Sequence, residues 1–152
     1  SEVPFAIETQ ALQTLSGVAV GPAAHAGSDI GQVPMVATTE EVARLVALAK
    51  RTHVAADVID YVVRLVSHTR QTPELRLGSS PRGALGLLRT SRVAAALQGR
   101  AYVVPGDVQR LAGPVLGHRV LVSPSFEASG GSGEDAVRIA VEAVAAPPLA
   151  RR

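Results

Sequence analysis

The sequence contains no cysteine and no tryptophan, and only 3% of its 152 residues are aromatic. Without cysteine the chain has no disulfide framework, no thiolate zinc site and no cysteine nucleophile. The scarcity of aromatic rings leaves little surface on which the bases of single-stranded nucleic acid can stack. No apolar run approaches the roughly 18 residues of a membrane-spanning helix, and Ser1-Glu2-Val3-Pro4 is not the basic start of a signal peptide. We therefore expect a soluble, cytoplasmic protein with no membrane partner.

The charge of the chain gives little indication of a partner. Its 15 basic and 13 acidic side chains leave a formal net charge of +2, which is too small to predict nucleic-acid binding. Lys50 is the only lysine, and it follows Ala49, so the Gly-Lys pair of a phosphate-cradling loop is missing. No aliphatic strand ends in Asp-Glu to hold magnesium. The chain alone is therefore not expected to hydrolyse a nucleotide.

Stretches rich in glycine and proline divide the sequence. We expect three parts, namely residues 1–37, 38–122 and 123–152. The first part predicts a short helix over 4–16, ended by Gly17, and then a connection over 17–37 with an extended piece at 33–36. An absent initiating methionine is typical of a processed or truncated chain.

The last part of the chain predicts a second linker and a final helix. Residues 123–133 hold one proline and three glycines, which is typical of a linker. The spacing of Ser132 and Asp135 predicts an N-terminal cap for a helix over 136–144. A loose tail is expected after that helix.

The central part has the periodicity of α-helices. Four helices are expected, over residues 39–52, about 58–70, 80–99 and 105–116. Thr38 and Glu41 have the spacing of a capping box at the first of them, and Val42, Leu45 and Val46 then recur on one face. Brief extended pieces are expected at residues 101–103 and 119–122. The fold class is therefore mostly α, a small helical bundle with minor extended segments and flexible ends.

The third predicted helix carries an arginine in its first turn. Ser80 can cap this helix, Pro81 suits its first position and Gly99 can end it, which places Arg82 beside its N-terminus. A helix N-terminus is partly positive, so a cation there costs about 0.3–1 kcal/mol, whereas an anion is favoured. The free backbone N–H groups, the Ser80 hydroxyl and the Arg82 guanidinium together match a phosphate or a carboxylate. The alternative is that Arg82 bends into solvent or pairs with an acid such as Glu74.

Arg89 lies seven residues after Arg82, and therefore on nearly the same side of the predicted helix. The two arginines can face a common ligand. The alternative is an ordinary solvated helix face that carries Arg89 and Arg92.

A series of short motifs runs through the central part in a fixed order. They are Thr69-Arg70, Pro73, Leu75, Leu77-Gly78, Ser80-Pro81-Arg82-Gly83-Ala84-Leu85, Gly99-Arg100, Tyr102-Val103, Pro105, Asp107-Val108 and His118-Arg119. With these motifs, residues 54–119 resemble the C-terminal lid of MoxR-family AAA+ ATPases. Ser79 stands where alanine is commoner in that family, and Val104 where a threonine or serine cap is common, so the fourth helix is expected to begin less firmly.

The resemblance implies that Arg82 is the sensor 2 arginine, which reaches from the lid to the γ-phosphate of ATP held by the core. The candidate nucleotide-binding residues are Ser80, Pro81, Arg82, Gly83 and Arg89. ATP and Mg²⁺ are the cofactors expected in the full-length protein. The partners implied are the AAA+ core domain of the same protein, neighbouring subunits of a hexameric ring and von Willebrand A domain proteins, on which the family acts as a chaperone.

Two other classes of function stay open at this point. One is a stand-alone helical DNA-binding regulator or adaptor, in which residues 80–99 read DNA and Arg82, Arg89 and Arg92 contact phosphates. The other is a small independent enzyme, which the missing motifs disfavour. No metal site is expected, because no two histidines stand four residues apart on a helix.

Overall fold

The computed structural model describes residues 36–148. The contacts between residues divide the chain into two units, Ser1–Val36 and Ala37–Arg152. The described helices and strands belong to the second unit. The helix predicted over 4–16 and almost all of the connection predicted over 17–37 lie outside the described residues.

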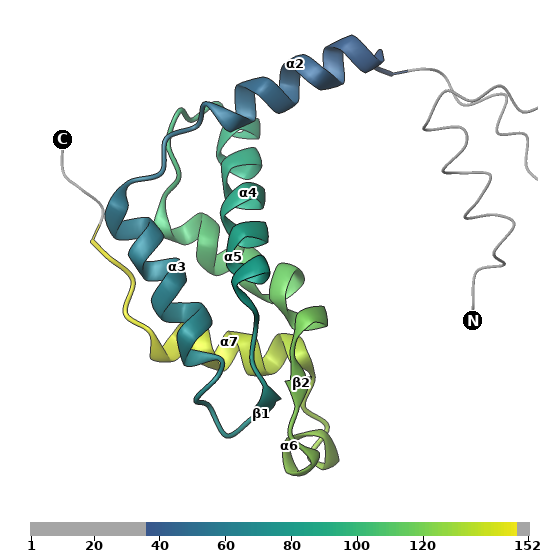
Figure 1. The fold of residues 1–152 in the computed structure, drawn as a ribbon, viewed down its shortest axis with the longest axis vertical. Coiled ribbons are helices and arrows are strands. Elements are labelled where there is room, and N and C mark those ends of the chain that lie inside the picture. The colour runs from purple at the N-terminus through teal and green to yellow at the C-terminus, as the bar shows by residue number, and fades with distance from the viewer. Residues whose placement is uncertain (1–35, 149–152) are drawn as a thin grey trace, which may run out of the picture. The chain divides into compact units, whose positions relative to one another are not determined.

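The described unit is mostly helical, as the sequence predicted (Figure 1). Its helices are α2 (Thr39–Lys50), α3 (Ala56–His68), α4 (Pro81–Leu97), α5 (Pro105–Leu116), α6 (Pro124–Ala128) and α7 (Gly133–Ala143). A single turn of 3-10 helix, η2 (Gly117–Arg119), follows α5. Gly99 has φ +70°, the left-handed conformation with which glycine commonly ends a helix, so α4 stops where the sequence predicted.

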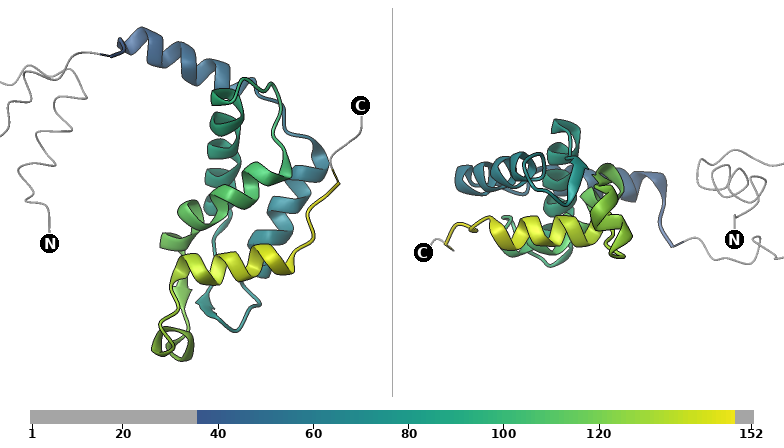
Figure 2. Two further views of the ribbon diagram at one scale, coloured as in Figure 1. Left: turned by 180° about the vertical axis from the view of Figure 1, so that it is seen from behind. Right: turned by 90° about the horizontal axis from the view of Figure 1, so that it is seen from below.

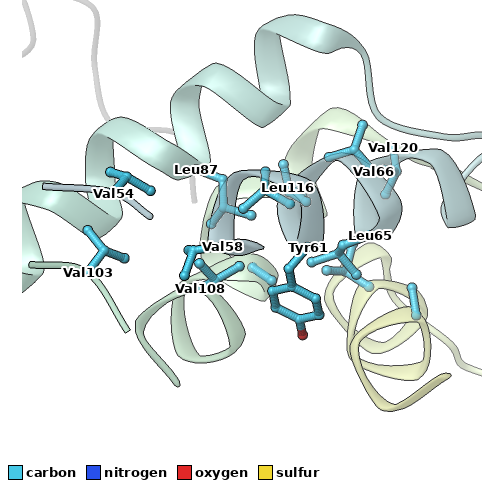
Figure 3. Close-up of a cluster of buried hydrophobic side chains, with 14 of the residues drawn as sticks. Val54, Val58, Tyr61, Leu65, Val66, Leu87, Val103, Val108, Leu116 and Val120 are labelled. Carbon is cyan, nitrogen blue, oxygen red and sulfur yellow. The ribbon is translucent and has the colours of Figure 1, made fainter. Parts of the chain in front are cut away.

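Helix α3 supplies the centre of the hydrophobic core (Figure 3). Its fully or nearly fully buried side chains include Tyr61, Val62 and Leu65, which pack with Leu87 of α4 and Leu116 of α5. Burying an aliphatic side chain of this size stabilises a fold by about 1.5–3 kcal/mol. The core therefore holds α3, α4 and α5 in fixed relative positions.

The periodicity of α3 predicts one apolar stripe, with Tyr61 in the core or at its rim, and one position of that stripe is wrong; its predicted members are Val58, Ile59, Val62, Leu65, Val66 and Thr69. Ile59 is 41% exposed, whereas Tyr61, which had been expected at the core or its rim, is fully buried. The buried face of α3 is turned slightly from the predicted one: α7 also packs on α3, and Tyr61 and Leu65 belong to the same buried cluster as Val137 of α7, whereas Ile59 does not.

The segment predicted as a linker, residues 123–133, contains the short helix α6. Its glycines serve tight turns, since Gly130 has φ +86° and any side chain at Gly131 would collide with the ring of Phe126. Ser132 and Asp135 form the predicted capping box at α7. Helix α7 buries Ala136, Val137 and Ala140 in the common core and lies against α5 (Figure 2). The apolar face of α7 is therefore covered by the same core as α3, α4 and α5.

The two strands are very short. Strand β1 (Leu75–Leu77), which was not predicted, pairs antiparallel with β2 (Leu121–Val122), and Leu77 lies opposite Leu121. The strand expected over residues 119–122 is partly replaced by η2. Segments of two or three residues are too short to show the alternation of a strand in sequence.

Helix α2 begins as predicted but packs less than predicted. The Thr38 N–H donates to the Glu41 carboxylate at 2.7 Å, and the Glu41 N–H donates to the Thr38 hydroxyl at 3.2 Å, which completes the capping box. Only Ala49 is buried, because α2 contacts the end of α4 and extends past it (Figures 1 and 2). Val42, Leu45 and Val46 are 49–58% exposed. Within residues 36–148, no helix has the length and apolarity needed to span a membrane.

A buried carboxylate ties the end of α4 to the start of α5. Asp107 is 2% exposed and accepts two hydrogen bonds from the Arg100 guanidinium, at 2.7 and 2.8 Å. It also accepts from the Val104 N–H at 3.0 Å and from Arg110 at 3.2 Å. Valine has no capping side chain, but the Asp107 carboxylate accepts from the Val104 N–H, so one half of a capping box is present at the start of α5.

Burial raises the pKa of Asp107, but hydrogen bonds from Arg100 and Val104 and the charges of Arg100 and Arg110 outweigh burial and lower it. The folded pKa is therefore below the unfolded pKa of about 3.9. A group with a depressed folded pKa stabilises the fold fully above the unfolded pKa, and this contribution is lost as the pH falls through the folded pKa.

Asp107→Asn should lower the free energy of unfolding by about 3 kcal/mol at pH 7, because it leaves Arg100 without its charged partner. Urea unfolding of the chain measures the change. Asp60→Asn is the matched control, since the Asp60–Arg64 pair is exposed and should be worth less than about 1 kcal/mol. The difference between wild type and Asp107→Asn should shrink as the pH falls below about 4. A difference that stays constant down to pH 2 would contradict the assignment.

Candidate functional site

Arg82 lies in the first turn of α4, and its side chain is exposed. Within residues 36–148 the guanidinium makes no hydrogen bond and no ion pair. The alternative in which it pairs with Glu74 is not seen, because the Glu74 carboxylate accepts a hydrogen bond from the Thr72 hydroxyl. That bond is the main cause of the lowered pKa of Glu74. Arg82 is therefore free to meet a group from another molecule or domain.

The positive end of α4 has no compensating side chain of its own. No acidic residue stands in the first turn, and the Ser80 hydroxyl makes no hydrogen bond to a backbone N–H of the helix. Ser80 is the N-cap residue as predicted, but its contribution is the backbone carbonyl, which accepts from the Gly83 N–H at 2.8 Å. The partial charge of the helix and the charge of Arg82 therefore add, and together they favour an anion.

Gly83 allows the first turn of α4 to lie directly on the core. It is buried, and a Cβ atom at this position would collide with the Ser79 hydroxyl and lie 3.2 Å from the side chain of Leu116. Pro81, on the exposed side, occupies the first helical position, where its missing N–H costs no helical hydrogen bond. One side of the turn that carries Arg82 is thus held against the core, and its other side is exposed.

The segment before α4 is attached to the end of α3. The Ser79 N–H donates to the Thr69 hydroxyl at 3.0 Å, and Arg70 Nε donates to the Ser79 carbonyl at 2.9 Å. Thr69 and Ser79 are both fully buried. At Gly78 any Cβ would collide with the Thr69 backbone, so the two segments are in direct contact. Sequence reasoning missed this role of Thr69, which was placed only at the end of an apolar stripe.

The exposed residues of α4 recur every three or four positions and form one outer face. Beyond Pro81, which is also exposed at the first position, they are Arg82, Leu85, Arg89, Val93 and Leu97. The guanidinium of Arg89, like that of Arg82, has no partner among the described residues. Arg92 is only partly exposed, and its Nε is buried without a hydrogen-bond partner. Arg82 and Arg89 therefore share the outer face of α4 while Arg92 does not, which weakens the three-arginine arrangement of the DNA-binding alternative.

The described residues offer one kind of ligand chemistry at this face. Guanidinium groups bind phosphate and carboxylate oxygens in a bidentate manner, so the site fits an anion. The part of the chain that the structure describes has no group of three or more histidine, aspartate or glutamate side chains arranged to hold a metal ion.

The chain is similar to known proteins in sequence and in fold. Residues 67–140 match a family model described as AAA lid domain. The uncharacterised protein YeaC of Bacillus subtilis is 40% identical over 88 residues, which cover 58% of this chain and 28% of YeaC. Chaperone MoxR1 of Mycobacterium tuberculosis is 32% identical over 127 residues, which cover 78% of this chain and 34% of MoxR1. This chain therefore spans about a third of the length of these relatives.

Two further comparisons concern sequence and fold. Protein MoxR of Paracoccus denitrificans is 45% identical over 53 residues, which cover 35% of this chain and 16% of that protein. A crystal structure of a presumed ATPase from Cytophaga hutchinsonii matches with a TM-score of 0.70 over 97% of this chain and 45% of that one. Its sequence is 20% identical, so the match shows a likeness of fold.

Two glycines of α4 should respond in opposite ways to replacement by alanine. Gly83→Ala should lower the free energy of unfolding by about 1–3 kcal/mol, because the added methyl group overpacks a closed contact. Gly86→Ala should raise it by up to about 1 kcal/mol, because its Cβ would lie 3.8 Å from Val115 and alanine favours the helix. Thermal or urea unfolding measures both. Equal effects of the same sign would show that the first turn of α4 does not lie against Ser79 and Leu116.

Proposed function

Because the chain carries the lid domain of a MoxR-family AAA+ ATPase, we propose that it completes an ATP site built by a separate nucleotide-binding core. Arg82 is the sensor 2 arginine in this proposal. One observation carries it: an exposed, unpaired guanidinium lies at a helix N-terminus that has no acidic residue and no side-chain cap. An anion delivered from outside the described residues would compensate both charges.

The role of Arg82 is to bind oxygens of the terminal phosphate and to stabilise the charge that develops there. ATP with Mg²⁺, when bound, supplies the phosphoanhydride and the metal charge that neutralises it. The described residues provide no metal cluster, so we assign the Mg²⁺ ligands to the core. The backbone that carries Arg82 is held in place, so its guanidinium needs little reorganisation as charge develops in the transition state.

The other candidate residues have supporting roles. The hydroxyl of Ser80 makes no cap hydrogen bond and is available to a phosphate oxygen. Pro81 and Gly83 shape the first turn of α4, and Gly83 keeps that turn close to the core. Arg89 lies about 10 Å farther along the helix axis, so we propose that it meets a second anionic group of the nucleotide or of the core.

The exposed apolar residues of this unit are the proposed contact with the ATPase core. Leu85, Val93 and Leu97 are 45–80% exposed on the same face of α4 as the two arginines. Helix α2 exposes a second apolar stripe that nothing within the described residues covers. Exposed apolar surface next to a charged site is typical of a docking surface. We propose that the core covers this surface when it closes on the nucleotide.

The wider function is proposed from the relatives. The name of the Mycobacterium tuberculosis relative contains the word chaperone. By that likeness we propose a ring-forming cytoplasmic ATPase, with neighbouring subunits as contacts and von Willebrand A domain proteins as substrates for remodelling. The comparisons do not favour the alternative of a helical DNA-binding regulator.

Arg82→Ala in the ATPase that contains this chain should lower kcat for ATP hydrolysis about 100-fold, because a charge-assisted contact to the transition state is lost. Steady-state ATPase kinetics measure this. The free energy of unfolding should not fall and should rise by up to about 1 kcal/mol, since Arg82 has no partner in the fold and its charge opposes the dipole of α4.

The matched control is Arg44→Ala, which removes another exposed arginine, on α2, and should leave kcat within about twofold of wild type. An Arg82→Ala variant with unchanged kcat would exclude the proposed role.

The chain without a core should bind ATP weakly or not at all, because one face of a nucleotide site cannot exclude water from the phosphates. Isothermal titration with MgATP and an assay for released phosphate check this. Phosphate release by the purified chain at a rate that scales with its concentration would contradict the assignment to a lid.

A further inference from the structure

We propose that Thr69 and Arg70 are positioning residues, which hold the start of α4 so that Arg82 points at its anion. This inference rests on the proposed function, since it concerns the direction of the sensor 2 side chain. Neither residue makes a hydrogen bond to the Arg82 side chain. Both act through the backbone of Ser79, three residues before it.

The Thr69 hydroxyl makes two hydrogen bonds inside the core. It donates to the Val66 carbonyl at 2.7 Å and accepts from the Ser79 N–H at 3.0 Å. Thr69 is fully buried, so no water replaces either bond. The hydroxyl therefore joins the last turn of α3 to the segment that leads into α4.

Arg70 binds the other polar group of the same residue. Its Nε donates to the Ser79 carbonyl at 2.9 Å, although the Arg70 side chain is itself largely exposed. The backbone N–H and carbonyl of Ser79 are thus held by two successive residues that directly follow α3. Gly78 also lies so close to the Thr69 backbone that no side chain fits between the two segments.

Packing against α3 and α5 holds α4 as a whole, and the hydrogen bonds to Ser79 hold the residues that lead into its first turn. The usual device at the start of a helix is a side-chain cap, and the Ser80 hydroxyl makes none. Gly83 fixes how closely the first turn lies on Ser79 and Leu116. It does not fix the direction from which the residues before α4 enter the helix. The attachment of Ser79 to α3 supplies that constraint. A change of about 1 Å at a catalytic group can cost about 100-fold in rate.

A double-mutant cycle in the intact ATPase separates positioning from simple stability. Thr69→Val keeps the shape of the side chain and removes the hydroxyl, and Thr69→Ser restores a hydroxyl. Thr90→Val is the matched control, because the Thr90 hydroxyl binds only the carbonyl of Gly86, four residues earlier in its own helix. Arg70→Ala is the second test, since Arg70 is exposed and its loss is tolerated more easily by the fold.

Thr69→Val and Arg70→Ala should each lower kcat about tenfold with little change in KM, because Arg82 then points away from the developing charge. Thr69→Ser should recover most of the rate, and Thr90→Val should stay within about twofold of wild type. In an Arg82→Ala background neither substitution should lower kcat further, because the group they position is absent.

The outcomes distinguish a failure of the positioning role from a failure of the proposed function. Where Arg82→Ala lowers kcat but Thr69→Val or Arg70→Ala lowers it equally in both backgrounds, the two residues contribute only stability and the positioning role is overturned. Where Arg82→Ala leaves kcat unchanged, the proposed function fails and the positioning role fails with it. If Thr69→Val does not fold, the same double-mutant cycle is measured with Arg70→Ala and Arg82→Ala. An unchanged kcat in Arg70→Ala then overturns the inference.

Discussion

The constraint on which the account depends is electrostatic: α4 begins with a cation at an end that is already positive. The fold does nothing to offset this cost of about 0.3–1 kcal/mol, since no acid stands in the first turn and no side chain caps it. The molecule instead fixes the surrounding backbone, with Gly83 against the core and Ser79 bound to α3. A preformed anion site requires an uncompensated charge on a backbone that is held in place.

A comparison of two charged residues shows the difference between structural and functional charge in this domain. Asp107 is buried and accepts hydrogen bonds from three donor groups, so its charge is compensated within the fold. Arg82 is exposed and unpaired, so its charge is available to another molecule. Both belong to motifs that were visible in sequence, yet only their surroundings show which of them stabilises and which can bind.

The sequence predicted the helices well, because capping boxes, an initial proline and a terminal glycine mark their ends. Helix α5 and the caps of α2 and α7 were confirmed for this reason. It predicted less about packing. Periodicity placed Ile59 in the core, because it cannot show which part of α3 the other helices cover. Glycine and proline content predicted a linker over residues 123–133, although this segment contains α6. The bonds from Thr69 and Arg70 to Ser79 span ten and nine residues, a contact that no local pattern reveals.

The account's central claim is that Arg82 meets the terminal phosphate of a nucleotide held by a core. The most direct test compares the binding of a non-hydrolysable ATP analogue and of ADP to the intact ATPase by calorimetry, with and without Arg82. If the claim holds, Arg82→Ala weakens binding of the analogue at least about tenfold, which corresponds to one charge-assisted hydrogen bond, and leaves ADP binding nearly unchanged. Equal loss for both nucleotides, or no loss for either, would contradict it.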